Sequence, residues 1–320
     1  MIKILANDGI HPSGEDLLEK AGFEVDTKNI SKDELPNQLN SYDVLLVRSA
    51  TKVRADLMDK APNLKMIGRG GVGMDNIDVE YAKSKNIEVF NTPKASSQSV
   101  AELVIAHLLC IARSLYISNA QMPSKGDVEF KSLKKVAGKN GFELQGKTMG
   151  IFGSGRIGKA TAQKAIALGM NVVFYNRKKT SGVLDISFNN NLNIDSLKYE
   201  FSSVSLDEFF KKADVISLHV PAVEKPLIGQ DEISKMKDGV ILINCARGGV
   251  VDESALASAL DNGKVAYAGI DVFDKEPPVD MTILKKKNVS LSPHIGGSTK
   301  EAQERIGIEL AEKIISFFKK

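Results

Sequence analysis

Residues 147–169 read KTMGIFGSGRIGKATAQKAIALG, an apolar run followed by three glycines and an amphipathic stretch. Gly153, Gly155 and Gly158 have the G-x-G-x-x-G spacing, and they fall between a predicted strand and a predicted helix. In this arrangement the first glycine allows a tight turn, the second lets a pyrophosphate approach the backbone, and the third lets the helix pack closely on the strand. The alternative is a glycine-rich turn without a ligand. Because the strand, turn, helix and next strand follow in the required order, we predict a dinucleotide-binding turn.

The alternation of strand and helix extends over the whole chain in two blocks. Amphipathic segments such as SGEDLLEKAG and DVEYAKSKN separate short apolar runs, which predicts parallel sheets covered by helices on both faces. A chain of 320 residues is long enough for two domains. We therefore predict an α/β protein with two doubly wound parallel-sheet domains. The predicted strands are IKILAND, DVLLVRS, LKMIGRG and IEVFNTP in the first block, and KTMGIFG, NVVFYN, DVISLHV, GVILINCA, YAGIDVF and NVSLSP in the second.

Composition excludes several classes of protein. The net charge is only +3 and the basic residues are scattered, which argues against a nucleic-acid partner. No apolar run approaches the roughly 20 residues that a membrane helix needs, and the first residues already form a strand rather than a signal peptide. The two cysteines, Cys110 and Cys245, give no sign of a disulfide framework or a zinc site. We expect a cytoplasmic protein without a structural metal.

One long helix is predicted over residues 96–121, where serines can cap the N-terminus of a mostly apolar segment. Its composition suggests burial, either in the core or between subunits. His107 lies within it and is expected to be a packed or interface residue. A glycine- and lysine-rich connection is predicted to follow, over residues 123–147.

The strand after the glycine turn ends in an unusual polar stretch, Asn176-Arg177-Lys178-Lys179. An acidic residue at this point accepts hydrogen bonds from the adenine ribose and favours NAD. Asparagine cannot exclude a 2′-phosphate by charge, and Arg177 can pair with one. The sequence therefore favours NADP or dual use slightly, and a solvated basic turn remains the alternative.

Three further segments, VILINCARGGVVDESAL, AYAGIDVFDKEPP and LSPHIGGSTKEAQ, closely resemble signature motifs of the D-isomer-specific 2-hydroxyacid dehydrogenases. The likeness covers nearly the whole chain. Within the family it is strongest to the D-3-phosphoglycerate dehydrogenases, through VRSATKVRADL, IGRGGVGMDNIDVE and NTPKASSQSVAEL. The resemblance implies a Rossmann-type cofactor domain, residues 99–297, inserted into a flavodoxin-like substrate domain, residues 1–98 and 298–320. It also implies a short form without the regulatory domains of some relatives.

The catalytic residues that the resemblance implies are Arg247, Glu276 and His294. Oxidation of a 2-hydroxy acid removes a hydride from C2 and a proton from the hydroxyl group. An imidazole is suited to accept that proton, and His294 would do so. Glu276 would hold the ring and favour the imidazolium. Arg247 would donate to the substrate carboxylate and to the developing carbonyl oxygen.

Substrate binding is expected at the strand ends of the first block, where Arg48 and Arg69 stand. The resemblance places the substrate phosphate at these arginines and its carboxylate near the loop Gly70, Gly71, Val72 and Gly73. The alternative is that both arginines pair with surface acids.

The cofactor contacts that the resemblance implies span both halves of the chain. Asp271 is the carboxylate suited to the nicotinamide amide, and Asn176 departs from the usual aspartate. The full set of predicted cofactor residues is Val72, Gly153, Gly155, Arg156, Ile157, Gly158, Asn176, Arg177, Val220, Cys245, Ala246, Asp271 and Gly296, with Arg247 and His294 also in contact.

The function expected from the resemblance is interconversion of 3-phospho-D-glycerate and 3-phosphohydroxypyruvate with NAD(H) or NADP(H), the entry step of serine biosynthesis. A homodimer built on the 96–121 helix is also expected. A hydroxypyruvate or glyoxylate reductase that uses NADPH is the first alternative. A cofactor-sensing protein that acts through partners, like corepressors of the same family, is a less favoured one.

Overall fold

The computed structural model describes residues 1–186 and 197–319. The chain divides into two compact units. Unit 1 comprises Met1–Ser99 and Gly297–Lys320, and unit 2 comprises Val100–Gly296. The predicted α/β fold with two parallel sheets is confirmed. Assignment of substrate binding to one unit and cofactor binding to the other stays a prediction.

Unit 1 contains a five-stranded parallel sheet in the order β2-β1-β3-β4-β5. This is the order of flavodoxin-like sheets, and it reverses between β1 and β3. The carboxyl ends of those two strands therefore flank the crevice in which such sheets bind ligands. The strands are β1 (Lys3–Ala6), β2 (Glu24–Asp26), β3 (Val44–Val47), β4 (Met66–Arg69) and β5 (Glu88–Asn91).

Successive strand residues point to opposite sides of the sheet, so its apolar residues lie on both faces. Helices cover both faces and bury these residues. Leu5 and Leu45 face α2, α3 and α4, whereas Ile4 and Leu46 face α1 and α11. The C-terminal helix thus packs in the core of the N-terminal unit. The helices of unit 1 are α1 (Pro12–Lys20), α2 (Leu35–Gln38) with the 3-10 turn η1 (Leu39–Ser41), α3 (Ala55–Asp59), α4 (Val79–Ser84) and α11 (Lys300–Phe318).

Unit 2 contains a six-stranded parallel sheet in the order β13-β12-β11-β10-β6-β7. The strand order reverses between β6 and β10, which places the glycine turn after β6 at the crevice of this sheet. An antiparallel hairpin of β8 and β9 lies outside the sheet and was not predicted. The strands are β6 (Thr148–Phe152), β7 (Asn171–Tyr175), β8 (Ser181–Ile186), β9 (Leu197–Ser202), β10 (Val215–Leu218), β11 (Val240–Asn244), β12 (Val265–Ile270) and β13 (Val289–Leu291).

Two apolar cores lie on the two faces of this larger sheet. On one face α5 and α7 cover Ile151, Val215 and Ile243. On the other, α8, α9 and α10 cover Ile216 and Leu242. The helices of unit 2 are α5 (Ser97–Ala112), whose first three residues belong to unit 1, α6 (Leu115–Asn140), α7 (Arg156–Ala167), α8 (Leu206–Lys212), α9 (Gln230–Lys235) and α10 (Glu253–Asp261).

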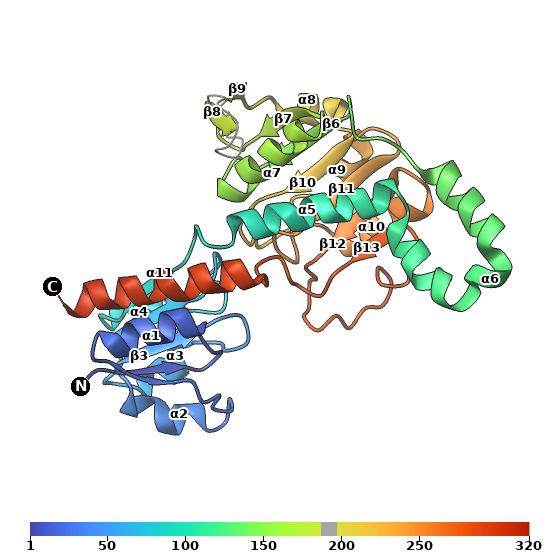
Figure 1. Ribbon diagram of the computed structural model, residues 1–320. Helices are drawn as coiled ribbons and strands as arrows, with labels where there is room; N and C mark the ends of the chain where they lie inside the picture. Colours follow the sequence, from blue (N-terminus) through green and yellow to red (C-terminus); the bar gives the residue numbers. More distant parts are fainter. Residues whose placement is uncertain (187–196, 320) are drawn as a thin grey trace. The chain divides into compact units, whose positions relative to one another are not determined.

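The predictions of one helix over residues 96–121 and of a connection over 123–147 are wrong. The first helix ends at Ala112, and Ser114 adopts a left-handed conformation with φ 51° before α6 begins. α6 then continues to Asn140 despite Pro123 within it, and it extends away from the rest of unit 2 (Figure 1). Among the described residues no single helix has the length and apolar content to span a membrane, although α5 and α6 together meet those criteria as a pair bent by 59°.

Candidate active site

The three glycines after β6 have the steric roles that their spacing predicts. Gly153 adopts φ +105°, and a Cβ atom there would lie 2.4 Å from the carbonyl oxygen of His219. A Cβ atom on Gly158 would lie 2.1 Å from the carbonyl oxygen of Gly153, so α7 packs directly on the turn. Gly155 differs, because no atom lies within 4 Å of a Cβ placed there. The turn is therefore closed on the protein side and open where a pyrophosphate would approach.

The N-terminus of α7 faces this open side. Gly155 is the N-cap and offers no side-chain cap, and the first helical bond runs from Lys159 N to Gly155 O at 2.9 Å. The preceding amides of Arg156, Ile157 and Gly158 have no partner within the helix. Free amides at the positive end of a helix dipole bind anions. The residues present thus fit the pyrophosphate of a dinucleotide.

Asn176 connects the end of β7 to the glycine turn. Its Oδ1 atom accepts from the amide of Ser154 at 2.8 Å, and its Nδ2 atom donates to the Ser154 hydroxyl at 2.9 Å. Arg177, Lys178 and Lys179 are exposed and form no ion pair within residues 1–186 and 197–319. The cations are therefore available to a ligand, and their role in cofactor choice stays a prediction.

His294 and Glu276 form a direct pair. Nδ1 of His294 lies 2.6 Å from Oε2 of Glu276, and the other carboxylate oxygen accepts from the amide of Phe273 at 3.2 Å. A carboxylate only accepts hydrogen bonds, so the proton of a neutral His294 ring resides on Nδ1. Nε2 then carries the lone pair, and 40% of the side chain is exposed. This arrangement suits a general base.

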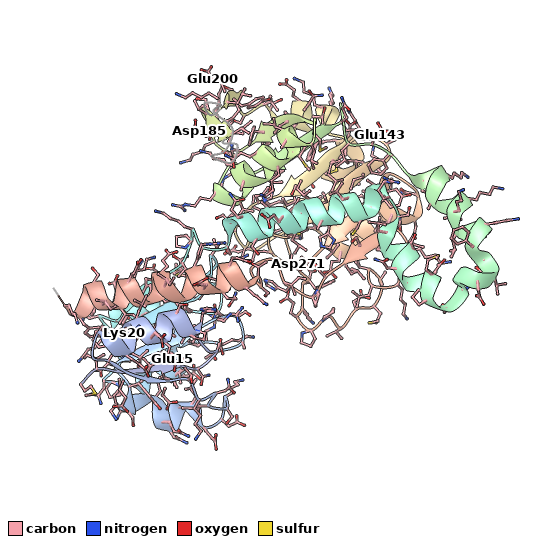
Figure 2. All side chains as sticks on the ribbon, in the orientation of Figure 1. Glu15, Lys20, Glu143, Asp185, Glu200 and Asp271 are labelled. Atoms are coloured by element: carbon pink, nitrogen blue, oxygen red, sulfur yellow. The ribbon has the colours of Figure 1, made fainter. Side chains whose placement is uncertain are left out.

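Asp271, labelled in Figure 2, directly follows the carboxyl end of β12. Its hydrogen bonds hold the loop that carries His294. Its buried carboxylate accepts from the amides of Ile295 at 2.8 Å and Gly296 at 3.0 Å, and from the Ser292 hydroxyl at 2.5 Å. Its carbonyl oxygen accepts from the amide of His294 at 2.8 Å. These bonds fix His294 in a left-handed conformation, φ 54°. The predicted contact of Asp271 with a nicotinamide amide stays a prediction beside this observed role.

Arg247 follows β11, and its loop is fastened to the loop of Glu276. Gly248 packs so closely that a Cβ atom on it would lie 1.9 Å from the carbonyl oxygen of Phe273. The amide of Gly249 donates to Asp274 at 2.6 Å. Because β11, β12 and β13 are neighbours, the predicted catalytic residues come from three adjacent strand ends.

The remaining predicted cofactor residues of unit 2 lie along the same sheet edge. Val220 is beside the glycine turn, with its Cγ1 atom 3.4 Å from a Cβ placed on Gly153. Cys245 and Ala246 are buried, and burial raises the pKa of the Cys245 thiol. Gly296 packs between Asp271 and Val100. Val72 belongs to unit 1.

In unit 1, Arg48 and Arg69 flank one dipeptide, Gly70-Gly71. A Cβ atom on Gly70 would lie 3.5 Å from Cγ of Arg48, and one on Gly71 would lie 1.8 Å from Nη1 of Arg69. Arg48 and Gly70 also line a hollow of about 260 Å³, together with Asp8. This hollow lies at the carboxyl ends of β1 and β3, where a flavodoxin-like sheet binds its ligand.

The glycine loop of unit 1 is only partly available to an anion. The amide of Gly70 donates to Val47 O at 2.8 Å, and that of Gly71 donates to the Thr92 hydroxyl at 2.8 Å. A substrate carboxylate near this loop, which stays a prediction, would therefore have to bind the amides of Val72 and Gly73.

Two positioning acids did not emerge from the sequence. Asp8 accepts from the amide of Arg48 at 2.7 Å and from the Thr51 hydroxyl at 2.6 Å, which holds the loop after β3. Glu253 accepts from the amide of Asp274 at 3.0 Å, which holds the loop of Glu276. Burial raises the pKa of Glu253. Their only sequence signal was a polar residue at a strand or helix end.

Comparisons with known proteins identify the family that this chain resembles. Residues 105–296 match the family model described as "D-isomer specific 2-hydroxyacid dehydrogenase, NAD binding domain". The chain is 45% identical to a hydroxypyruvate reductase of Thermotoga maritima, over 98% of this chain and 97% of that protein. It is 42% identical to a D-3-phosphoglycerate dehydrogenase of Methanocaldococcus jannaschii, over 98% of this chain but only 57% of that protein.

A solved structure extends the comparison to bound cofactor. An NADPH-dependent glyoxylate/hydroxypyruvate reductase from Sinorhizobium meliloti, in complex with NADP and malonate, matches with a TM-score of 0.74 and 27% identity over 99% of this chain and 93% of that one. The expected use of NAD(H) or NADP(H) is in keeping with the nucleotides bound in the family. With a family model over more than half of its length and close relatives along nearly all of it, the chain belongs to the D-isomer specific 2-hydroxyacid dehydrogenases, which are NAD-dependent oxidoreductases.

Proposed function

We propose that this enzyme interconverts 3-phospho-D-glycerate and 3-phosphohydroxypyruvate, with NAD(P) as hydride acceptor or donor. The observation that carries the choice of substrate is the pair of guanidinium groups, Arg48 and Arg69, on either side of Gly70-Gly71. Two cations at one sheet edge suit an acid with a phosphate as well as a carboxylate. Glyoxylate and hydroxypyruvate have no phosphate group to pair with these two cations.

The residues of unit 2 would carry the chemistry. In the oxidative direction Nε2 of His294 accepts the hydroxyl proton, while Glu276 keeps the ring oriented through its 2.6 Å bond to Nδ1. Arg247 donates to the substrate carboxylate and to the oxygen that becomes a carbonyl. The turn from Gly153 to Gly158 would hold the nicotinamide nucleotide, which supplies the hydride acceptor when bound. In the reductive direction His294 returns the proton to the oxygen.

Hydroxypyruvate reduction is the second candidate. It is favoured by the 45% identity to the hydroxypyruvate reductase of Thermotoga maritima, which this chain matches over 97% of its length. The D-3-phosphoglycerate dehydrogenase of Methanocaldococcus jannaschii is considerably longer than the matched region. The two candidates share the catalytic residues and differ in whether unit 1 binds a phosphate.

Steady-state kinetics with both keto acids separates the candidates. We expect the wild-type enzyme to reduce 3-phosphohydroxypyruvate with a higher kcat/KM than hydroxypyruvate. Replacing Arg48 and Arg69 together by Gln should lower kcat/KM for the phosphorylated acid by about 100-fold or more, because each charge-assisted pair contributes roughly 1.5–3 kcal/mol. The value for hydroxypyruvate should change by less than about fivefold, since its binding lacks those pairs.

Arg54→Gln is the matched control for loss of a positive charge in unit 1. Arg54 is exposed and its Nη2 atom donates to the carbonyl oxygen of Asp75 at 2.9 Å, so the variant should behave like the wild type. If hydroxypyruvate is the better substrate, or if the double variant loses both activities equally, the phosphate assignment fails and hydroxypyruvate reduction takes its place.

We also infer that the enzyme is a homodimer, and we place its reaction at the cytoplasmic entry to serine synthesis. The dimer is supported by apolar side chains on the projecting helix α6, where Met122, Val128 and Phe130 are 41%, 84% and 54% exposed. Such side chains favour contact with another protein surface. Light scattering coupled to size-exclusion chromatography would give the mass of the particle in solution, which should be twice that of the 34.7 kDa chain. The placement in serine synthesis is correct only if the enzyme uses the phosphorylated substrate.

A further inference from the structure

His107 is a polar residue in the middle of an apolar helix, and both of its ring nitrogens are engaged. The residue is 4% exposed. Nδ1 lies 2.8 Å from the hydroxyl of Ser290 on β13, and Nε2 lies 2.9 Å from the hydroxyl of Ser292 just beyond that strand. The ring packs on β12 at Gly269, where a Cβ atom would come within 2.9 Å of the Cβ atom of His107. The strand β12 and the two serines together form a site that matches the shape and the hydrogen-bonding groups of an imidazole.

The chemistry of the groups fixes the direction of each hydrogen bond. Ser292 has one hydroxyl proton and donates it to Asp271 Oδ1 at 2.5 Å, because a carboxylate only accepts. Ser292 must therefore accept from Nε2–H of His107. Burial lowers the pKa of His107, an effect that the charge of Asp271 opposes, so the ring is neutral near pH 7. Nδ1 then has no proton and accepts from Ser290.

This series of hydrogen bonds ends at the loop of His294, the predicted catalytic histidine. Asp271 receives the hydroxyl of Ser292 on Oδ1, and its two oxygens hold the amides of Ile295 and Gly296. Those amides follow His294 directly. A serine hydroxyl has several staggered orientations, and only one of them points to Asp271. A donor on the other side of Ser292 removes the alternatives, whereas a half-satisfied buried network would be costly.

We propose that His107 is a positioning residue for the reaction: by donating to Ser292, it orients the Asp271 carboxylate that holds the loop of His294. The proposal rests on the proposed function only in taking His294 as the proton acceptor. A misplacement of about 1 Å near the reacting groups can lower a rate by roughly 100-fold. The network would thus act on kcat, while the arginines of unit 1 and the glycine turn after β6 lie outside it.

Substituting His107 by glutamine or asparagine tests the two ring nitrogens one at a time, because these two amide side chains differ in length. The amide nitrogen of glutamine can reach the position of Nε2 and donate to Ser292, whereas that of asparagine reaches only the position of Nδ1. We expect His107→Asn and His107→Leu to lower kcat by about 10–100-fold with KM changed by less than about threefold. His107→Gln should restore kcat to within about threefold of the wild type. Ser290→Ala should leave kcat close to the wild-type value, because Ser290 lies outside the link to Asp271.

Two measurements test the network without turnover. The chain has four histidines, so nitrogen-15 spectra of labelled imidazoles resolve each ring. His107 should show the neutral tautomer with its proton on Nε2. Hydrogen exchange at the amides of Ile295 and Gly296 should be at least about tenfold faster in His107→Asn than in His107→Gln, because the carboxylate that protects them loses its fixed orientation.

The outcomes separate failure of this proposal from failure of the proposed function. A proton on Nδ1 of His107, or equal amide exchange in the Asn and Gln variants, overturns the positioning role even if the enzyme is active. Equal losses of kcat in all three His107 variants overturn it as well, since they would indicate packing alone. If the wild type reduces no keto acid while tautomer and exchange are as expected, the network is supported and the proposed reaction is wrong.

Discussion

At the residue scale, Asn176 shows how one side chain can serve both the fold and ligand choice. It holds the Ser154 segment of the glycine turn through two hydrogen bonds. An aspartate could accept the same amide bond and would add a negative charge at the ribose end of the site. Because Arg177 is exposed beside it, the local charge in this chain is positive. The charge at this position, rather than the backbone, is therefore expected to decide between NADH and NADPH.

We predict that Asn176→Asp shifts nucleotide preference toward NADH. The ratio of kcat/KM for NADPH to that for NADH should fall by about tenfold or more, since a carboxylate repels the 2′-phosphate and each factor of ten corresponds to about 1.4 kcal/mol. Arg177→Ala should lower the efficiency with NADPH alone. Steady-state kinetics with both nucleotides gives the ratio, and Lys212→Ala, on the surface of α8, is a control for general charge loss. Equal effects on the two nucleotides would instead identify the basic turn as solvated.

Individual residues differ in how far the sequence could reveal their roles. Glu276 and His294 were predicted because each sits in a distinctive motif, and their 2.6 Å contact joins them. The loop-holding bonds of Asp271 could not be predicted, because they are made to backbone amides that come together only in the fold. The same applies to His107, whose serine partners lie more than 180 residues away in sequence. Gly70 and Gly71 are the opposite case, where the motif was noticed but two of its amides are already used.

At the element scale, the glycines of the segment from β6 through the turn to α7 have different steric roles, and mutations can test each role separately. Gly158 is enclosed, with a Cβ position 2.1 Å from Gly153 O, whereas Gly155 faces open space. Gly155 also has φ −67° and ψ −173°, which any L-residue can adopt. Close packing of α7 on the turn therefore depends on the glycine at 158, and the approach of a ligand depends on the one at 155.

We predict that Gly155→Val folds normally but does not bind nucleotide. Its Tm should lie within about 2 °C of the wild type, because no protein atom lies within 4 Å of a Cβ atom placed at this position. Affinity for NADH should fall by about 100-fold or more, because the side chain occupies the pyrophosphate position. Gly158→Ala should lower Tm by several degrees, since overpacking costs typically 1–3 kcal/mol. The chain contains no tryptophan, so fluorescence of bound NADH can be measured without that background. Tight NADH binding by Gly155→Val would show that the turn is not the nucleotide site.

The elements that the sequence failed to predict share a physical cause. The ten predicted strands are confirmed, because buried parallel strands are short apolar runs. β2 was missed because it is a short edge strand without a buried residue. Residues 123–140 of α6 were read as part of a connection because this stretch is rich in glycine and lysine, yet most of its residues are compatible with a helix. Local signals of this kind are weak where no apolar face is present to confirm them.

At the scale of the whole molecule, the two units are linked by only two chain crossings, after Ser99 and after Gly296. Each unit has its own pair of apolar cores, one on each face of its sheet. Domains with separate cores can respond separately to ligands. A nucleotide that binds the glycine turn should therefore stabilise unit 2 more than unit 1.

We predict that NADH at about 100 times its Kd slows hydrogen exchange of the most protected amides in β6 and β10 by up to about 100-fold, which corresponds to roughly 2.7 kcal/mol. Amides in β1 and β3 should change by less than about threefold, because the nucleotide contributes free energy only to the unit whose folded state it binds. Exchange followed by peptide mass spectrometry gives both regions in one experiment, and Gly155→Val with the same nucleotide is the control in which neither region should respond. Equal slowing in the two sheets would mean that the units open as one cooperative block. Slowing in β1 and β3 alone would mean that unit 1, and not unit 2, binds the nucleotide.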